Sequence, residues 1–260
     1  MAPRIRVEDR DGGLRVITLD NPQKRNALDD EMLADLAKAV APKGSAQVRV
    51  LLVQGEGPAF CAGYDLSALG PAAPKGALPD EHIFDVFRAL ADHPAPSVAL
   101  VRGPAIGAGC ELACACDFRV GSTAAVLCMP PAKLGVVYSP EGLWRLANLV
   151  GVAKAKLMFL TARRVPAATA LAWGLLDEVW NEAERQSESH AVALCTELAA
   201  AAPLAVSGMK RSFRLLSASR LGKAERAELD ALRRKAFNSE DVQEGLAAFL
   251  DKRPPEFRGK

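Results

Sequence analysis

The sequence has little net charge and no long apolar run, and both shortages exclude classes of protein. Its 260 residues include 33 Lys and Arg against 31 Asp and Glu, which gives a formal net charge of +2. This balance provides no strong field for nucleic acid or for an anionic membrane surface. No stretch approaches the roughly 20 apolar residues that span a bilayer, and residues 1–13 lack the apolar run of a signal peptide. We therefore expect a cytoplasmic protein with neither nucleic acid nor membrane as a partner.

Paired cysteine spacings and metal-ligand clusters are also missing. The chain has six cysteines in mainly apolar surroundings, which is typical of reduced, buried thiols rather than of a disulfide framework. They are Cys61, Cys110, Cys114, Cys116, Cys128 and Cys195. None of the three histidines stands at ligand spacing from the 110–116 group, and no second ligand pair is present. We expect no bound metal.

What the sequence does contain is the alternation of strands and helices of an α/β protein. "RIRVED" and "LRVITLD" predict a hairpin around Gly12-Gly13, and "VRVLLVQG" and "PSVALVRG" predict buried parallel strands. "DEMLADLAKAV" and "DEHIFDVFRALADH" have helical apolar spacing. Nearly everything after about residue 182 reads as amphipathic helix, which would expose too many leucines alone. We divide the chain into a core of residues 1–200 and a helical assembly region of residues 201–260.

A glycine-rich stretch, "GPAIGAGCELACAC" at 103–116, follows one of the predicted strands. It is no dinucleotide fingerprint, because Leu112 stands where the third glycine is needed, and no Gly-Lys-Ser or Gly-Lys-Thr follows. A helix that begins near Ala108 would present backbone N–H groups at its positive end, and small side chains would let a ligand oxygen reach them. "FCAGYDL" at 60–66 repeats this small-residue pattern after the preceding strand. Helix packing alone would not explain the repetition, so we predict two converging backbone amides, an oxyanion hole.

Four motifs in order give the chain a resemblance to the crotonase superfamily, the enoyl-CoA hydratase/isomerase family, along nearly its whole length. The motifs are "NPQKRNAL", "FCAGYDL", "GAGCELACACDFRV" and "SEDVQEGLAAFLDKRPPEF". The resemblance implies a spiral of repeated β-β-α units in two nearly perpendicular sheets. It also implies homotrimers or dimers of trimers built through the carboxyl-terminal helices.

The resemblance further implies acyl-coenzyme A thioester substrates and no metal or redox cofactor, coenzyme A being part of the substrate. By position, the amides of Tyr64 and Ala108 are the oxyanion donors. The coenzyme A contacts fall on Lys24, Arg25, Ala62, Asp65, Phe249 and Lys252. A solvated turn at 24–25 and an exposed tail at 252 are the plain structural alternatives.

The acid and base groups match the family only in part. Glu111 stands where the family hydratase has its first glutamate, although a carboxylate in the first turn of a helix also suits the helix dipole. The second glutamate is replaced by Pro131, which carries no proton. Glu141, in "YSPEG", resembles the single glutamate of some family isomerases, yet Ser139 and Pro140 also make it part of an ordinary helix start.

Tyr138 leaves another reaction open. "LGVVYSPEG" also resembles a segment of methylmalonyl-CoA decarboxylase in which a tyrosine helps to hold the departing carboxylate. The leading prediction is an enoyl-CoA hydratase or isomerase, and the alternative enzyme is a decarboxylase of a malonyl-type thioester. A non-enzyme alternative is an RNA-binding relative, for which "KRSFR" and "RRK" are the basic segments. Their charges alternate with apolar helix positions, which favours a solvated helix face.

Overall fold

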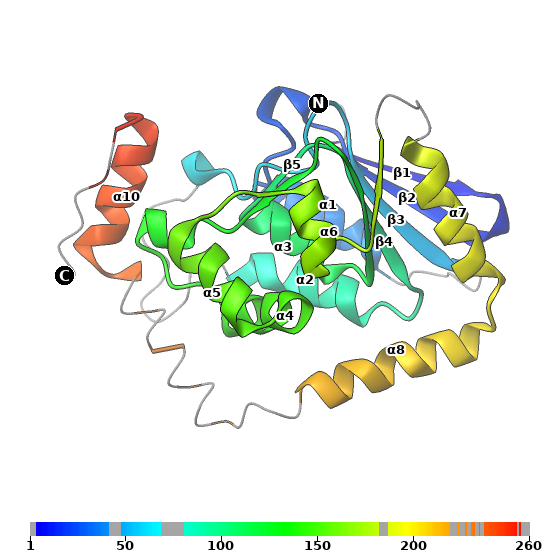
Figure 1. Cartoon of the computed structure of the whole chain (residues 1–260). Coiled ribbons are helices and arrows are strands. Elements are labelled where there is room, and N and C mark those ends of the chain that lie inside the picture. The colour runs from blue at the N-terminus through cyan, green and yellow to red at the C-terminus, as the bar shows by residue number, and fades with distance from the viewer. Residues whose placement is uncertain are drawn as a thin grey trace.

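The computed structural model describes residues 4–41, 48–68, 81–181, 187–218, 237–253 and 255, with single positions at 223, 227, 230, 231 and 234. Figure 1 shows a twisted sheet with helices around it and the carboxyl-terminal helices at the periphery. The strands are β1 Ile5–Arg10, β2 Leu14–Leu19, β3 Val50–Gly55, β4 Ser97–Val101, β5 Pro104–Ile106, β6 Phe118–Ser122, β7 Val126–Cys128, β8 Val165–Pro166 and β9 Glu178–Trp180. The α-helices are α1 Asp30–Val40, α2 Glu81–Asp92, α3 Ala108–Ala115, α4 Pro140–Val150, α5 Val152–Thr161, α6 Ala167–Trp173, α7 Ser187–Ala200, α8 Pro203–Ala218 and α10 Glu240–Leu250. Short 3-10 turns are η1 Asp11–Gly13, η2 Pro22–Lys24, η3 Leu66–Ala68 and η4 Pro131–Leu134.

The main sheet has six strands in the order β1-β2-β3-β4-β6-β9. β1 and β2 form the predicted antiparallel hairpin, whose turn needs positive φ at Gly12 and Gly13. All other neighbours in this sheet are parallel. The carboxyl ends of β3 and β4 therefore lie at the same edge, and the loops that follow them start side by side.

The continuous apolar strands are buried on both faces, as the sequence predicts. In β3, Leu51 and Val53 face a core shared with α1, α2 and α3, whereas Val50 and Leu52 face a second core that includes Ala191 and Cys195 of α7. This division follows from the two-residue period of a strand. All six cysteines are free and buried, which confirms the expectation of reduced thiols.

A second sheet has the order β5-β7-β8, and its first strand, β5, comes between β4 and α3 in the chain. The prediction of a strand that ends at Gly103 is wrong in this detail, whereas the predicted helix start near Ala108 is confirmed. β4 ends at Val101, and Pro104–Ile106 then forms β5 beside β7. Gly103 turns the chain with φ +66°, and a side chain there would collide with the Pro58 carbonyl. The short β5 aims the start of α3 at the loop after β3.

The described carboxyl-terminal part is mainly helical. The predicted boundary at residue 200 coincides with the break between α7 and α8, where the chain bends by 105°. α7 covers the second face of the sheet, and α8 runs outward from it (Figure 1). Among the described residues, no single helix is long and apolar enough to cross a bilayer. The bent pair of α7 and α8 reaches that length and composition only when the two helices are taken together. The separate assembly role of residues 201–260 stays a prediction.

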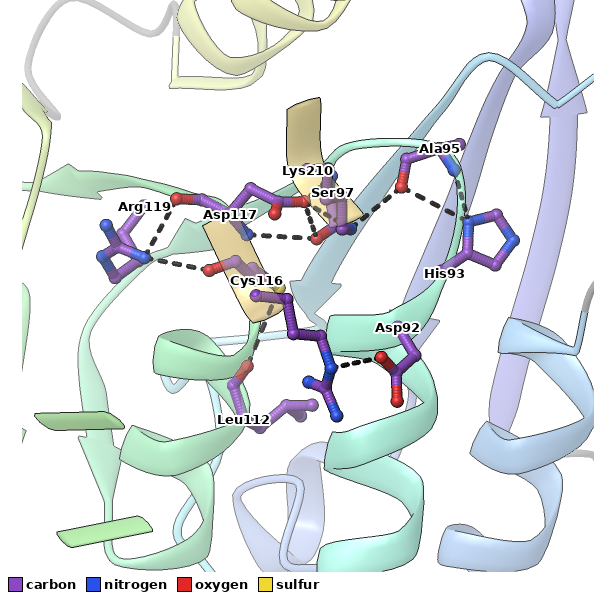
Figure 2. A network of polar contacts seen from close by, with 10 residues as sticks. Asp92, His93, Ala95, Ser97, Leu112, Cys116, Asp117, Arg119 and Lys210 are labelled. Carbon is purple, nitrogen blue, oxygen red and sulfur yellow. Dashed lines mark hydrogen bonds and ion pairs between the residues drawn. The ribbon is translucent and has the colours of Figure 1, made fainter. Parts of the chain in front are cut away.

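A polar network attaches α8 to the core, as Figure 2 shows. Lys210 of α8 donates to the Ala95 carbonyl oxygen at 3.1 Å and to Asp117 Oδ2 at 2.6 Å. Asp117 Oδ2 also accepts from the Ser97 hydroxyl and from the Ser97 backbone N–H. One ammonium group thus connects α8 to the residues that enter β4 and β6.

We expect Lys210→Met to lower the free energy of unfolding by about 1–3 kcal/mol, because the partly buried Asp117 and the Ala95 carbonyl lose a charged donor. Urea denaturation followed by circular dichroism measures the change. Lys38→Met is the matched control, since Lys38 bonds Asp35 at a similar 2.7 Å but on the exposed surface of α1. An equal loss in both variants would contradict the anchoring role of Lys210.

Candidate active site

The amino-terminal motif is fixed to the sheet edge by one buried side chain, Asn26. Its Nδ2 donates to the carbonyl oxygens of Glu56 and Ala59, each at 2.9 Å, and of Phe60 at 3.2 Å. Its Oδ1 accepts from the Asn21 amide at 2.9 Å. Asn26 adopts the left-handed conformation with φ +57°, which asparagine tolerates better than most residues. Sequence reasoning missed this residue, although an asparagine inside a turn motif was the available signal.

The two glycine-containing loops lie against each other, as the sequence predicts. The Ile106 amide donates to the Cys61 carbonyl oxygen at 3.0 Å, and Cys61 and Ala105 form a parallel bridge. A Cβ on Gly63 would lie 2.6 Å from Ile106 O and 3.5 Å from Ala108 N. The structure thereby brings the Gly63–Tyr64 backbone beside the first residue of α3.

Gly107 and Gly109 have different roles within the same stretch. Gly107 precedes α3 with φ +54° and donates its N–H to the Cys128 carbonyl oxygen at 2.8 Å. A side chain on Gly109 would collide with the backbone of Cys61, so Gly109 permits close packing. Ala108 between them is the first helical residue of α3, where N–H groups have no partner inside the helix.

Glu111 lies one turn into α3 with its side chain 2% exposed, and it forms an ion pair with Arg145 of α4. Arg145 Nη1 bonds Glu111 Oε1, whereas the buried Oε2 accepts no hydrogen bond of ordinary geometry from the described residues. Burial raises the pKa of Glu111, against the effects of the Arg145 charge and the Tyr138 hydroxyl. Sequence reasoning missed Arg145, because 34 residues separate the two partners and no local pattern connects them.

Tyr138 and Gly142 form the wall next to this carboxyl group. A Cβ on Gly142 would lie 2.8 Å from both Glu111 carboxyl oxygens and 2.5 Å from Tyr138 Cε1. The Tyr138 ring packs edge-on against Phe84, at 5.6 Å between centroids, and against Phe159 at 5.4 Å. The carboxyl group of Glu111 therefore occupies space that only a glycine at 142 leaves open.

Glu141 stands at the helix start that the sequence predicts. The Ser139 hydroxyl oxygen accepts from the Gly142 amide at 3.0 Å, with Pro140 as the first residue of α4. The Glu141 side chain is about one third exposed and pairs with Arg88 of α2 at 3.5 Å. It lines a cavity of about 360 Å³ whose wall includes Arg145. Its charge adds to the rise in the pKa of Glu111.

The expected coenzyme A residues divide into two groups. Lys24 Nζ bonds Asp65 Oδ2 at 2.7 Å, an interaction that raises the pKa of Lys24 and lowers the pKa of Asp65. The Ala62 amide donates to the Arg25 carbonyl oxygen at 2.9 Å, so these four residues lie together.

Phe249 and Lys252 lie elsewhere, at the exposed end of α10. That helix packs on η4, where a Cβ on Gly245 would meet the Leu134 backbone at 2.7 Å. In the described part of the chain, no hydrogen bond or ion pair joins either residue to Lys24 or Asp65.

The residue at the position of the missing glutamate, Pro131, has no side-chain group that can transfer a proton. Pro131 is buried and opens η4, and its carbonyl oxygen accepts from the Val136 amide at 3.0 Å. The neighbouring Pro130 Cδ would lie 3.7 Å from a Cβ on Gly107, so this segment borders the glycine loop. Among the described residues, no group of three or more His, Cys, Asp or Glu side chains is arranged to hold a metal ion. The absence of a cofactor stays a prediction.

Comparisons with known proteins identify relatives over almost the full length. A family model described as enoyl-CoA hydratase/isomerase matches residues 9–260. A probable enoyl-CoA hydratase of Mycobacterium tuberculosis is 36% identical over 243 residues, covering 94% of this chain and 95% of that protein. Carnitinyl-CoA dehydratase of Escherichia coli K12 is 33% identical over 260 residues, covering 96% and 97%.

Solved structures agree with these sequence matches. Methylmalonyl-CoA decarboxylase in complex with 2S-carboxypropyl-CoA superimposes with a TM-score of 0.91 at 26% identity, covering all of both chains. An enoyl-CoA hydratase/isomerase of Pseudoalteromonas atlantica T6c gives a TM-score of 0.86 at 26% identity, covering 98% of this chain and 100% of the other. The motifs, the fold and the matches together show that this chain belongs to the enoyl-CoA hydratase/isomerase family.

Proposed function

We propose that the protein is an acyl-coenzyme A enzyme that adds water to an enoyl thioester or moves its double bond. The observation that carries the proposal is the convergence of the Gly63–Tyr64 backbone and the start of α3 within one helical turn of a buried carboxyl group, Glu111. The amides of Tyr64 and Ala108 hold the thioester oxygen. Two donors aimed at that oxygen in a site sheltered from water stabilise the charge of a thioester enolate.

Glu111 is the proton-transfer group in this mechanism. In an isomerisation it takes a proton from one carbon of the acyl chain and returns it to another, so a single carboxyl group is sufficient. In hydration the same carboxylate takes a proton from water as the oxygen attacks the double bond, and the enolate then accepts that proton from Glu111 at carbon. Pro131 takes no part in either reaction, which makes Glu111 the central group and Glu141 the candidate for a second.

Binding of the coenzyme A portion falls to the loop residues beside the glycines. Lys24 and Arg25 supply positive charge for its phosphates, and Ala62 and Asp65 lie next to them. Phe249 and Lys252 serve the same nucleotide from the end of α10. Because they lie apart from Lys24, we infer that they contact the coenzyme A bound by a neighbouring subunit of the assembly.

Decarboxylation of a malonyl-type thioester is a second candidate, favoured by Tyr138. Its ring lies against Gly142 and beside the Glu111 carboxyl group, and solved methylmalonyl-CoA decarboxylases are among the structural neighbours. This reaction needs a stabilised enolate but no strong base. Incubation with crotonyl-, 3-enoyl- and methylmalonyl-CoA, followed by mass spectrometry of the products, separates the reactions. Carbon dioxide release that Tyr138→Phe slows and Glu111→Gln spares would establish the second candidate.

Assembly through the carboxyl-terminal helices is part of the proposal. Large apolar side chains are exposed there, including Leu204 at 87% and Phe213 at 71%. We expect light scattering to give a mass near three or six times 27.6 kDa, and Leu204→Glu to lower it, because an unpaired charge would be placed in an apolar interface. Leu171→Glu, on α6, is the matched control that keeps the native mass. A monomeric wild-type chain would refute the assembly.

Ala108→Pro tests the second oxyanion donor with little change to the fold. Proline is well tolerated as the first residue of a helix, and Gly107 before it has a φ, ψ pair of 54°, −120° that glycine adopts readily. We expect turnover to fall about 100-fold to 1,000-fold, since one donor N–H is deleted. Steady-state kinetics measure the loss, and circular dichroism verifies folding. Normal turnover by a folded variant would exclude this amide.

Glu111→Gln removes the proton-transfer group while it preserves the shape of the side chain. We expect turnover to fall roughly 100-fold or more with thioester binding retained, because general acid–base catalysis contributes that magnitude. Isothermal titration with a saturated acyl-CoA verifies binding. Glu141→Gln is the comparison variant: an equal loss there would assign a two-carboxyl mechanism, and normal turnover would leave Glu141 as part of the helix start. Full activity of the double variant would refute carboxylate catalysis.

A further inference from the structure

We propose that Arg145 is a positioning residue that keeps Glu111 ionised and leaves Oε2 as the oxygen that takes the proton. The inference rests on the proposed role of Glu111 as base and adds a residue from a different helix to that role. Arg145 itself exchanges no proton.

The burial of the two partners makes their ion pair decisive. A carboxylate that is almost fully removed from water loses its hydration, and it becomes neutral unless a charge partner replaces that hydration. The Arg145 side chain is 17% exposed and meets Oε1 from α4, whereas Oε2 lacks a hydrogen bond among the described residues. Arg145 thus holds Oε1, and Oε2 is the oxygen that we assign to proton transfer.

Other charged and titratable groups surround the pair but do not replace Arg145. Burial raises the pKa of Glu111, and the Glu141 charge acts in the same direction. Tyr138 lowers it through its hydroxyl, and Cys114 of α3 lies near the same carboxylate. Two neighbouring cations among the described residues have other partners: Arg88 of α2 pairs with Asp85 and Glu141, and Arg214 of α8 pairs with Asp92. Arg145 is the cation whose hydrogen bond reaches Glu111.

Gly142 supplies an independent geometric restraint. With a Cβ there 2.8 Å from both carboxyl oxygens, any larger residue would push the Glu111 side chain from its place opposite Arg145. The position of the carboxyl group is thus fixed from two sides, by attraction to Arg145 and by the space that Gly142 leaves. A proton taken by Oε2 forms an O–H bond. In isomerisation the electrons of the broken C–H bond move into the thioester enolate; in hydration the water oxygen keeps the electrons of its broken O–H bond and bonds to carbon, and the electrons of the double bond move into the enolate.

Infrared difference spectroscopy tests the inference without turnover. The carboxyl band of Glu111 is identified as the one that Glu111→Gln removes, and it is titrated with pH in each variant. We expect Arg145→Met to raise the pKa of Glu111 by about one unit or more, since the opposite charge that favours the ionised form is lost. We expect Arg145→Lys to restore part of the shift. A pKa that is the same in wild type and in a folded Arg145→Met variant would overturn the proposal.

Arg119→Met is the matched control for general loss of stability. Arg119 is a 3% exposed arginine that pairs with Asp177 at 2.8 Å, so its loss also disrupts a buried ion pair. The control is expected to leave the pKa of Glu111 unchanged. An equal shift in Arg119→Met would show a structural effect and refute the specific role of Arg145. If Arg145→Met does not fold, Gly142→Ala displaces the carboxyl group with Arg145 intact. It is expected to raise the same pKa, and an unchanged value would contradict the inference.

The pH dependence of kcat/KM separates this inference from the proposed function. With Glu111 as base, the acidic limb of the profile moves to higher pH in Arg145→Met, because a larger fraction of the carboxyl group is protonated at each pH. A lower rate with an unmoved limb would make Arg145 merely structural. If the infrared titration shows a shifted pKa of Glu111 in Arg145→Met but the wild-type protein turns over no thioester, the proposed function is refuted. The effect of Arg145 on the pKa of Glu111 is then still supported.

Discussion

The site depends on one close backbone contact, between the loop that follows β3 and the start of α3. Gly63 and Gly109 permit it, because a Cβ at either position would enter the backbone of the other segment. The parallel order of β3 and β4 brings the two loops to one edge of the sheet, and β5 turns the second loop towards the first. Asn26 holds the preceding residues 56–60 in place through three carbonyl oxygens. The exact approach of two peptide groups thus results from strand order, missing side chains and one buried amide.

The same contact determines the environment of Glu111. Because α3 begins at Ala108, the carboxylate lies in the first turn, where the helix dipole favours a negative charge. Its burial acts in the opposite direction and is the larger effect, since the pKa of Glu111 is raised. An ion pair from α4 offsets part of this cost. A carboxyl group with a raised pKa is a stronger base than an exposed one, which suits it to take a proton.

Local patterns in the sequence were sufficient for β1 to β4, the helix starts and the glycine loops, because each of these depends on residues close together in the chain. The Ser139-Pro140 start of α4 and the hairpin at Gly12-Gly13 are examples. The ion pair of Glu111 with Arg145 and the clamp made by Asn26 connect residues that are 30 or more positions apart, and no periodicity records such a pairing. The three-residue β5 was missed because its pairing with β7, and not its own composition, makes it a strand. The four motifs predicted the family and the expected site residues by resemblance, but they do not include Arg145 or Gly142.

Because Pro131 replaces the second family glutamate, we expect the reaction to depend on how the acyl chain lies beside the remaining carboxyl group. The proline opens η4, and the end of η4 packs against α10 through Gly135 and Gly245, where side chains would collide with the opposing backbone. This segment therefore acts as support for the carboxyl-terminal helix and no longer as a source of protons. On the proposed mechanism, one buried carboxyl group beside the glycine loops serves hydration or isomerisation, according to whether water or a carbon of the acyl chain lies next to it. Tyr138 packs against both Phe84 and Phe159 beside this carboxyl group, so we expect the shape of this aromatic wall to influence how an acyl chain lies next to Glu111.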